Sequence, residues 1–419
     1  MTAKSHSHKE LLPHLFRLEY AKMTAVLCRH FGLQHIETAE DIVSETFLKA
    51  TELWGVKGIP ENPAAWLYTV AKNKTRDYLR RQAIFATKVT GALLADSSTL
   101  APDFDFQQQT IADSQLAMIF AVCNPANAPE AQICLALQIL CGFSVQEIAH
   151  AFLAKPDTIK KRLLRARANL RNDHFQIRAL AEASIQSRLD TVLSTLYLLF
   201  NEGYFSATND QVIRKDLCSE AIRLTLLLTE NALTNTTEAN ALLALMCYQS
   251  SRLDARANDA GETILYEEQD KSLWSAELIE KGNHYLVNAC TGAEVSRYHL
   301  EAGIAYWHTT PTATNKWAPI LQLYNQLLLI AYSPMTALNR TFALAKVYGH
   351  ERGLAEAETL QLIDNPHYHA LLAYLLADTD PGKAIRCYQQ AIALTPSKAG
   401  KQTLQQAVAK LRQKQQDGA

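Results

Sequence analysis

The segment from Ser144 to Arg171 constrains the fold of this chain more than any other part of the sequence. Ser144 and Glu147 have the spacing of a capping box, in which each side chain binds the other residue's backbone N–H at a helix start. A turn follows, and Pro156 stands where the first residue of a second helix tolerates a missing N–H. The pattern predicts two short helices joined by a turn, whose inward-facing residues are Ile148, Ala149 and Phe152, then Ile159, Leu163 and Ala166.

The second of these helices is strongly basic. Between Lys155 and Arg171 there are seven basic residues and one acidic residue, a net charge of +6. A helix-turn-helix with this charge predicts binding in a groove of duplex DNA. The alternative is a helical hairpin with a merely solvated basic face, but the capping box, the turn and the apolar positions accompany the charge. The basic residues expected largely on the surface are Lys160, Lys161, Arg162, Arg165, Arg167 and Arg171.

The composition is that of an ordinary globular protein with several domains. The chain has 419 residues and a net charge of −1, so any affinity for nucleic acid has to come from local basic surfaces. Its eight cysteines form no Cys-x-x-Cys pair, which argues against a disulfide framework or a zinc site. The N-terminal residues lack the apolar core of a signal peptide, and no apolar run is long enough for a membrane span. We therefore expect a cytoplasmic protein that does not bind membranes.

The motifs do not indicate an enzyme. Glycine-rich phosphate loops and nucleophile–base signatures do not occur, so we expect no catalytic residues, no cofactor and no metal. In the segment ILYEEQDKSLW, Glu267, Glu268 and Asp270 would suit an acid–base pair of a hydrolase. The favoured interpretation is a capped loop, in which Gln269 or Asp270 binds backbone before a helix that starts near Lys271.

Almost every segment has helical periodicity, which predicts an all-α protein. We expect a first helical block over residues 1–83, a polar linker over 84–110 and a second block over 111–178 that ends in the helix-turn-helix. A long helical extension should occupy residues 185–419. Within it, residues 334–396 carry a weak repeat of about thirty residues that resembles tetratricopeptide repeats. Such repeats usually offer a concave surface, so we expect a protein or peptide ligand there.

The first block contains an acidic helix and a basic one. From Glu37 to Glu52 there are five acidic residues and one lysine, and Asp41 and Glu45 should face outward together. The following helix, expected over Asn62 to Arg81, combines cations with aromatic side chains. Cations that follow phosphates and rings that stack on bases suit single-stranded nucleic acid. The cations of this second helix are Lys72, Lys74, Arg76, Arg80 and Arg81.

The aromatic residues of the basic helix have two interpretations. Trp66 and Tyr78 are either core residues beside solvated cations or part of a nucleic-acid surface, and for Trp66 we favour the core. For the cations as a group we favour nucleic acid. Helical spacing places Leu67, Val70, Ala71 and Tyr78 inward, and it places Lys72, Thr75 and Arg76 on another face with Tyr68.

Three segments in the correct order resemble bacterial RNA polymerase sigma factors of the extracytoplasmic-function type, group IV of the sigma-70 family. TAEDIVSETFLKATELW resembles their region 2.1–2.2, NPAAWLYTVAKNKTRDYLRR region 2.3–2.4, and PEAQICLALQILCGFSVQEIAHAFLAKPDTIKKRLLRARANL region 4. The segments LYLLFNEGY and ARANDAGETILYEEQDKSLW, with the repeat-like end, resemble a subfamily with a long helical C-terminal extension. The resemblance implies a region 2 bundle and a region 4 helix-turn-helix in a protein that directs promoter recognition and transcription initiation.

The resemblance also implies roles for individual residues. Glu40, Asp41 and Glu45 would bind the β′ clamp helices of core RNA polymerase, and region 4 would bind the β flap. The loop from Gly55 to Pro63 would shape a pocket for a flipped base of promoter DNA. Leu153 replaces the usual glycine of the turn, so we expect a reshaped turn. The −10 element would be held by Tyr68, Lys72, Asn73, Arg76, Asp77 and Arg80, and the −35 element by Lys155, Asp157, Thr158, Lys160, Lys161, Arg162 and Arg165.

Two other functions compete with this interpretation. One is a stand-alone helix-turn-helix regulator that binds duplex DNA unaided and uses the helical repeats as a sensor. The other is a helical-repeat scaffold or enzyme with incidental charge patterns. The acidic helix and the cation–aromatic helix favour the sigma factor, because a regulator that binds only duplex DNA needs neither. In that case we expect the extension to regulate the sigma portion in cis or to dock on polymerase.

Overall fold

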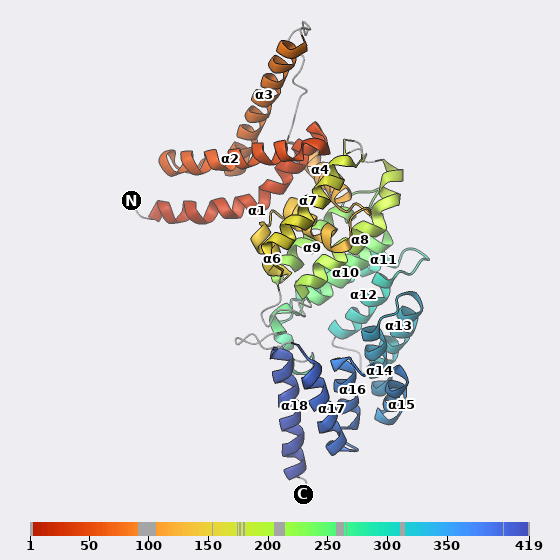
Figure 1. Cartoon of the computed structure of the whole chain (residues 1–419). Coiled ribbons are helices and arrows are strands. Elements are labelled where there is room, and N and C mark those ends of the chain that lie inside the picture. The colour runs from red at the N-terminus through yellow and green to blue at the C-terminus, as the bar shows by residue number, and fades with distance from the viewer. Residues whose placement is uncertain are drawn as a thin grey trace. The chain divides into compact units, whose positions relative to one another are not determined.

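A computed structural model of the chain describes residues 3–90, 106–152, 154–173, 175, 177–178, 181–204, 214–256, 264, 266–310, 315–396 and 398–417. Within these ranges the ordered elements are helices and no strand occurs, which confirms the all-α prediction (Figure 1). Clustering of contacts gives two compact units, Met1–Leu196 and Tyr197–Ala419. Across the described residues no helix combines the length and the apolar character that a membrane span requires.

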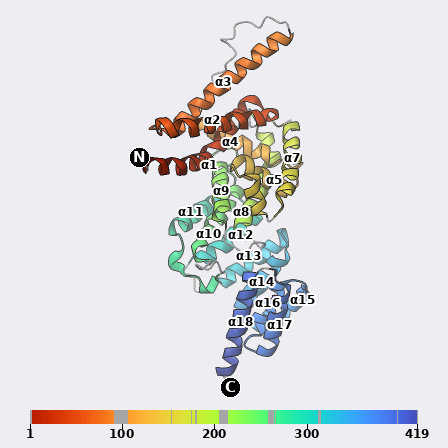
Figure 2. The ribbon, with the colours of Figure 1, turned by 60° about the vertical axis from the view of Figure 1, so that its left-hand side comes forward.

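The first unit begins with three long helices. They are α1 (Ala3–Phe31), α2 (Ile36–Lys57) and α3 (Pro63–Thr90), with the short turn η1 (Leu33–His35) between the first two. Gly32 and Gly58 have φ angles of 94° and 88°, which only glycine adopts readily, and they end α1 and α2. Helices α1 and α2 lie side by side, while the C-terminal part of α3 projects away from both (Figures 1 and 2). Helix α3 continues past residue 84, where the polar linker was expected to begin.

The second half of the first unit contains the segment that was expected to form a helix-turn-helix. The elements of this half are α4 (Gln108–Val122), α5 (Pro129–Leu135), the π-helical turn η2 (Ala136–Leu140), α6 (Val145–Ala151) and α7 (Pro156–Asn172). The capping box of α6 is present, with the Ser144 N–H donating to the Glu147 carboxylate at 2.8 Å. Helix α7 begins at Pro156 as predicted, and the inward positions of both helices are buried or half-buried. Leu153, expected to reshape the turn, lies outside the described residues.

Helix α8 (Glu182–Tyr204) contributes its first part to the core of this unit. Arg188 donates two hydrogen bonds to Asp173, at 3.0 and 2.8 Å, and Thr195 donates to Gln132 at 2.6 Å. The expected start of the extension at residue 185 therefore lies inside a helix that packs against α5 and the end of α7 in the first unit.

The second unit is built around one buried helix. Its first elements are α9 (Lys215–Thr229), α10 (Thr237–Ser250), three 3-10 turns, η3 (Leu253–Ala255), η4 (Tyr266–Glu268) and η5 (Lys271–Leu273), then α11 (Ala276–Ala289), α12 (Arg297–Thr309) and α13 (Trp317–Ile330). Every residue of α10 from Ala239 to Tyr248 is buried, because α9, α11 and α12 pack around it. A helix that is apolar on all sides is expected at such a position.

Consecutive helices pack against each other through the rest of the second unit. They are α14 (Pro334–Tyr348), α15 (His350–Leu360), α16 (Pro366–Leu376), α17 (Pro381–Leu394) and α18 (Lys398–Asp417). Each contacts the next, and α16, α17 and α18 run side by side in both views (Figures 1 and 2). Pro334 and Pro366 each open a helix after a side-chain cap, from Ser333 and Asn365. The weak sequence repeat thus coincides with two successive helical hairpins.

Candidate functional site

Helix α3 exposes one polar stripe. Asn73, Arg76, Asp77 and Arg80 are all exposed, and helical spacing places them on one face. Within the stripe, Arg80 pairs with Asp77 at 3.3 Å. Lys72 is half-buried at the edge of this face. The structure therefore brings together four of the six side chains expected at the −10 element.

Thr75 and Tyr68 do not belong to that stripe. Thr75 is 1% exposed and its hydroxyl donates to the carbonyl of Ala71, so its expected place beside Arg76 on the outer face is wrong. The Tyr68 hydroxyl donates to the Glu19 carboxylate. Burial, followed by this bond to Glu19, raises the pKa of Tyr68 far above its ordinary value. The Tyr68 side chain is thus anchored to α1 rather than free on the surface.

Trp66 and Tyr78 of α3 pack inside the helical bundle. The half-buried Trp66 ring lies 5.3 Å from the ring of Trp54, and the Tyr78 ring lies 5.7 Å from that of Phe31. Both contacts are edge-to-face, an arrangement that aromatic pairs prefer. The packing supports the core interpretation of Trp66.

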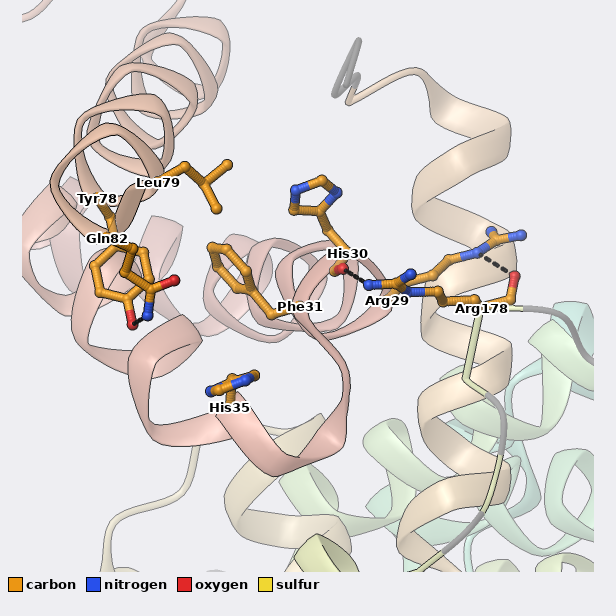
Figure 3. Close-up of a pocket in the computed structure, with 8 residues that line it drawn as sticks. All are labelled: Arg29, His30, Phe31, His35, Tyr78, Leu79, Gln82 and Arg178. Atoms are coloured by element: carbon orange, nitrogen blue, oxygen red, sulfur yellow. Dashed lines mark hydrogen bonds between the residues drawn. The ribbon is translucent and has the colours of Figure 1, made fainter. Parts of the chain in front are cut away.

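Residues of α1 and α3 line a cavity of about 500 Å³, and Figure 3 shows its lining side chains. Helical spacing places Tyr78, Leu79 and Gln82 on the side of α3 opposite to the polar stripe. The cations of the cavity are already engaged, because Arg178 donates to the carbonyl of His30 at 2.7 Å and Arg29 donates to that of Arg178 at 3.3 Å. Burial and the charge of Arg178 lower the pKa of His30. These contacts tie the end of α1 to the chain beyond α7, and the pattern of α1 gave no signal for them. The lining residues are Arg29, His30, Phe31, His35, Tyr78, Leu79, Gln82 and Arg178.

Helix α7 presents a second basic surface. Its buried side carries Ile159, Leu163, Ala166 and Leu170. Arg162 is half-buried and donates to the Cys134 thiol at 3.8 Å, so it points toward α5 rather than outward. The other six residues expected at the −35 element are exposed: Lys155, Asp157, Thr158, Lys160, Lys161 and Arg165.

Arg167 and Arg171 of α7 were expected largely on the surface, but both form ion pairs with α2. Arg167 donates to both oxygens of the Glu40 carboxylate, at 2.9 and 2.7 Å, and also to Gln138 at 2.9 Å. Burial opposes the charge of Arg167, but the hydrogen bonds and the charge of Glu40 outweigh it and raise the pKa of the guanidinium. One turn further along, Arg171 pairs with Glu37. The basic helix and the acidic helix are therefore joined by two ion pairs.

The acidic face of α2 is divided by this contact. The side chain of Glu40 is only 16% exposed because Arg167 covers it. Asp41 is exposed, and Glu45 is exposed but pairs with Lys74 of α3. Three residues were expected to bind polymerase. Glu40 and Glu45 form ion pairs, whereas Asp41 forms none with a described residue.

The acidic segment of the second unit has a structural role. Asp270 caps the turn η5 by accepting from the Ser272 N–H at 2.9 Å, which supports the interpretation as a capped loop. Glu267 pairs with Lys346 at 3.0 Å and Glu268 with Lys410 at 2.7 Å. Across the described residues no group of three or more His, Cys, Asp or Glu side chains could hold a metal ion.

Comparison with known proteins gives two family matches and two relatives. The Sigma-70 region 2 family matches residues 15–84, and a family of unknown function, DUF6596, matches residues 188–290. The chain is 34% identical over 378 residues to "Uncharacterized protein R00370" of Rhizobium meliloti (strain 1021), across 88% of each chain. It is 29% identical over 130 residues to "ECF RNA polymerase sigma factor BldN" of Streptomyces coelicolor, which is 31% of this chain and 48% of that protein. No solved structure matches the chain.

The ion pair between α7 and α2 predicts a difference between two neighbouring arginines. Arg167→Gln should lower the free energy needed to separate the helices by about 1.5–3 kcal/mol, because it leaves the Glu40 carboxylate without its charged partner. Amides at the start of α2 should then exchange with deuterium at least about tenfold faster. Arg165→Gln, on the exposed face, is the matched control and should leave exchange unchanged. Equal exchange in both variants would contradict the role of the pair.

Proposed function

We propose that the chain is a sigma factor of the sigma-70 family and, within this family, a group IV, extracytoplasmic-function type factor. In that role it binds core RNA polymerase and directs it to promoters through their −10 and −35 elements, without a reaction of its own. The region 2 match over α1, α2 and most of α3 carries this proposal. The basic helix-turn-helix that follows in the same unit supports it.

The exposed stripe of α3 suits the opened −10 element. Arg76 and Arg80 would follow the phosphates of the non-template strand, while Asn73 and Asp77 would contact base edges or order the cations. The half-buried Lys72 would contribute at the rim of this surface. The hydroxyl of Tyr68 is bonded to Glu19 of α1, so Tyr68 would support the packing of α3 on α1 rather than stack on a base.

The exposed face of α7 suits the closed −35 duplex. A helix that follows a tight turn enters the major groove with its N-terminal residues first, and Lys155, Asp157 and Thr158 lie at that end of α7. Lys160 and Lys161 would contact phosphates and set the helix in register. Arg162 would not contact DNA but would stabilise the packing of α7 against α5 through its bond to Cys134.

Polymerase binding would use the acidic face of α2. Asp41 is exposed and would bind the basic clamp helices of the β′ subunit directly. Glu40 would first have to exchange Arg167 for a cation of polymerase. Such an exchange replaces one ion pair by another, so it avoids the cost of leaving a buried carboxylate alone. Region 4 would bind the β flap. The contact between α2 and α7 would therefore be a closed form of the free protein that polymerase opens.

The extension would act on this sigma portion in cis. Its hairpins from α14 to α17 are of the tetratricopeptide type in our proposal, because consecutive helices pack in order with a repeat of about thirty residues. Stacked hairpins of this kind dock a protein or a peptide, polymerase included. A stand-alone regulator with a repeat sensor is the second candidate, and the region 2 match weighs against it.

The polymerase interface is tested by reversing one charge. Asp41→Arg should abolish retention of bacterial core RNA polymerase in a pull-down, because it places a cation against the basic clamp helices. Asp190→Arg, an exposed position on α8, is the matched reversal and should retain polymerase like the unchanged chain. Circular dichroism should show both variants folded. If Asp41→Arg still retains polymerase, α2 does not form this interface.

The duplex interface is tested by salt dependence. Lys160→Ala and Lys161→Ala should each weaken binding of the polymerase complex to a promoter selected from random DNA. Each should also reduce the slope of log affinity against log salt by about one, because one phosphate contact is lost. Lys281→Ala, an exposed lysine of α11, should change neither value. An unchanged slope in both α7 variants would show that another surface binds the duplex.

The extension is tested by truncation after Tyr204, where α8 is complete. A cut at residue 185 would remove Arg188 and Thr195 from the packing of the first unit. The chain of residues 1–204 should differ from the full chain by at least about fivefold in run-off transcription or core affinity if the two parts are coupled. Unchanged activity and unchanged core binding, in a truncated chain that is folded, would defeat the proposed regulation.

A further inference from the structure

The second unit contains a cavity whose chemistry the proposed function does not use. It has a volume of about 420 Å³, within the range of small-molecule sites, and residues of α8, α10, α12, α13 and α14 form its walls. A second cavity of about 510 Å³ shares Tyr266, His308 and Thr309 with it. The lining of the first cavity includes five tyrosines: Tyr197, Tyr204, Tyr248, Tyr266 and Tyr324.

Two cations meet at the ring of Tyr266. The Arg252 guanidinium lies 5.1 Å from its centroid, and the Lys316 ammonium lies 4.4 Å from it and donates to its hydroxyl at 2.8 Å. Arg252 also lies 5.8 Å from the ring of Trp274. Neither cation forms an ion pair with any residue that the structure describes. Arg252 lines the first cavity and Lys316 the second, and Tyr266 lines both. The nearby Glu267 attracts Lys316 but is itself paired with Lys346 at 3.0 Å. Partly buried charges usually have an ion-pair partner, so positive charge is in excess where the two cavities meet.

The surrounding groups do not cancel that charge. Burial, and then the charges of Lys316 and Arg252, lower the pKa of His308 to about 3, so its imidazole is neutral at pH 7. Burial lowers the pKa of Lys316; the charge of Glu267 opposes this shift, and the charges of Arg252 and Lys346 add to it. Glu301 is the carboxylate that lines the first cavity, where it pairs with Arg297 at 3.4 Å, and Glu280 lines the second.

Several buried polar atoms of the same residues have no hydrogen-bond partner among the described residues. They are Nε of Arg252, Oε1 of Gln249, Nδ1 of His308 and, in the second cavity, Nε1 of Trp274. Buried polar atoms are nearly always hydrogen-bonded in folded proteins. These atoms therefore offer donors and acceptors to a polar ligand group beside the two cations.

We propose that the two cavities, where they share Tyr266, bind a small aromatic acid, a carboxylate or phosphate ester of a planar ring. The anionic group binds Arg252 and Lys316 through charge-assisted hydrogen bonds, and the ring packs against the tyrosine side chains. Tyr197, Tyr248, Arg252, Tyr266 and Trp274 all lie within residues 188–290, so the proposal gives the matched family of unknown function a ligand-binding role.

The test is calorimetric titration of the full chain with benzoate and with phenyl phosphate. At least one acid should bind saturably, at one molecule per chain, with a Kd below about 1 mM. The tighter of the two identifies the preferred anion. Benzamide, the neutral analogue of benzoate, should not bind, and inorganic phosphate should bind more weakly than phenyl phosphate. If neither acid binds, or if benzamide binds as well as benzoate, the proposal is overturned.

Substitutions of the two cations test whether the acid binds at this site. Arg252→Gln should weaken binding of the preferred acid at least about tenfold, because a charged hydrogen-bond donor is lost. Lys414→Gln, an exposed lysine of α18 paired with Asp378, is the control and should bind normally. Should Arg252→Gln fail to fold, Lys316→Gln decides, with a weakening of at least about threefold expected. Unchanged affinity in a folded variant overturns the proposal. Polymerase is absent from this experiment, so its result does not depend on the proposed function.

Discussion

One half-buried ion pair determines which surfaces of the first unit are open. Arg167 of α7 binds both carboxylate oxygens of Glu40 of α2, and the two side chains are only 15% and 16% exposed. Taking two charges out of water is costly, and only their mutual attraction offsets that cost. Removing one of the two side chains from the pair leaves the other charge without its partner, so an incoming ion that takes its place lowers the cost. The pair joins the helix that we propose to bind polymerase, α2, to the helix that we propose to bind DNA, α7.

The pair engages the two helices unequally. On α7 it uses Arg167, and Arg171 binds Glu37 beside it, while Lys160, Lys161 and Arg165 stay exposed. The contact therefore leaves the basic outer face of α7 uncovered. On α2 it covers part of the acidic face. If α2 binds polymerase as we propose, a cation of polymerase has to displace Arg167 from Glu40, whereas the outer face of α7 needs no such exchange.

The elements that could be predicted from the sequence are those that depend on near neighbours. The capping box of Ser144 and Glu147 and the start of α7 at Pro156 involve residues within one helical turn, so their spacing was sufficient. Thr75 was misplaced because a threonine can satisfy its hydroxyl on its own helix backbone and then pack as an apolar residue. The partner of Arg167 could not be predicted, since it lies in a distant segment and many acidic residues were available.

Some half-buried cations of the two units differ in the groups that stabilise them. In the first unit the half-buried Arg167 and Arg188 each pair with a carboxylate. In the second, Arg252 and Lys316 have aromatic rings beside them but no ion pair with a described residue. A ring face attracts a cation by about 0.5–2 kcal/mol, which is less than the cost of withdrawing that cation from water. An anion is the group that would stabilise this arrangement most, which is why the cavity, rather than the surface, is where a ligand is expected.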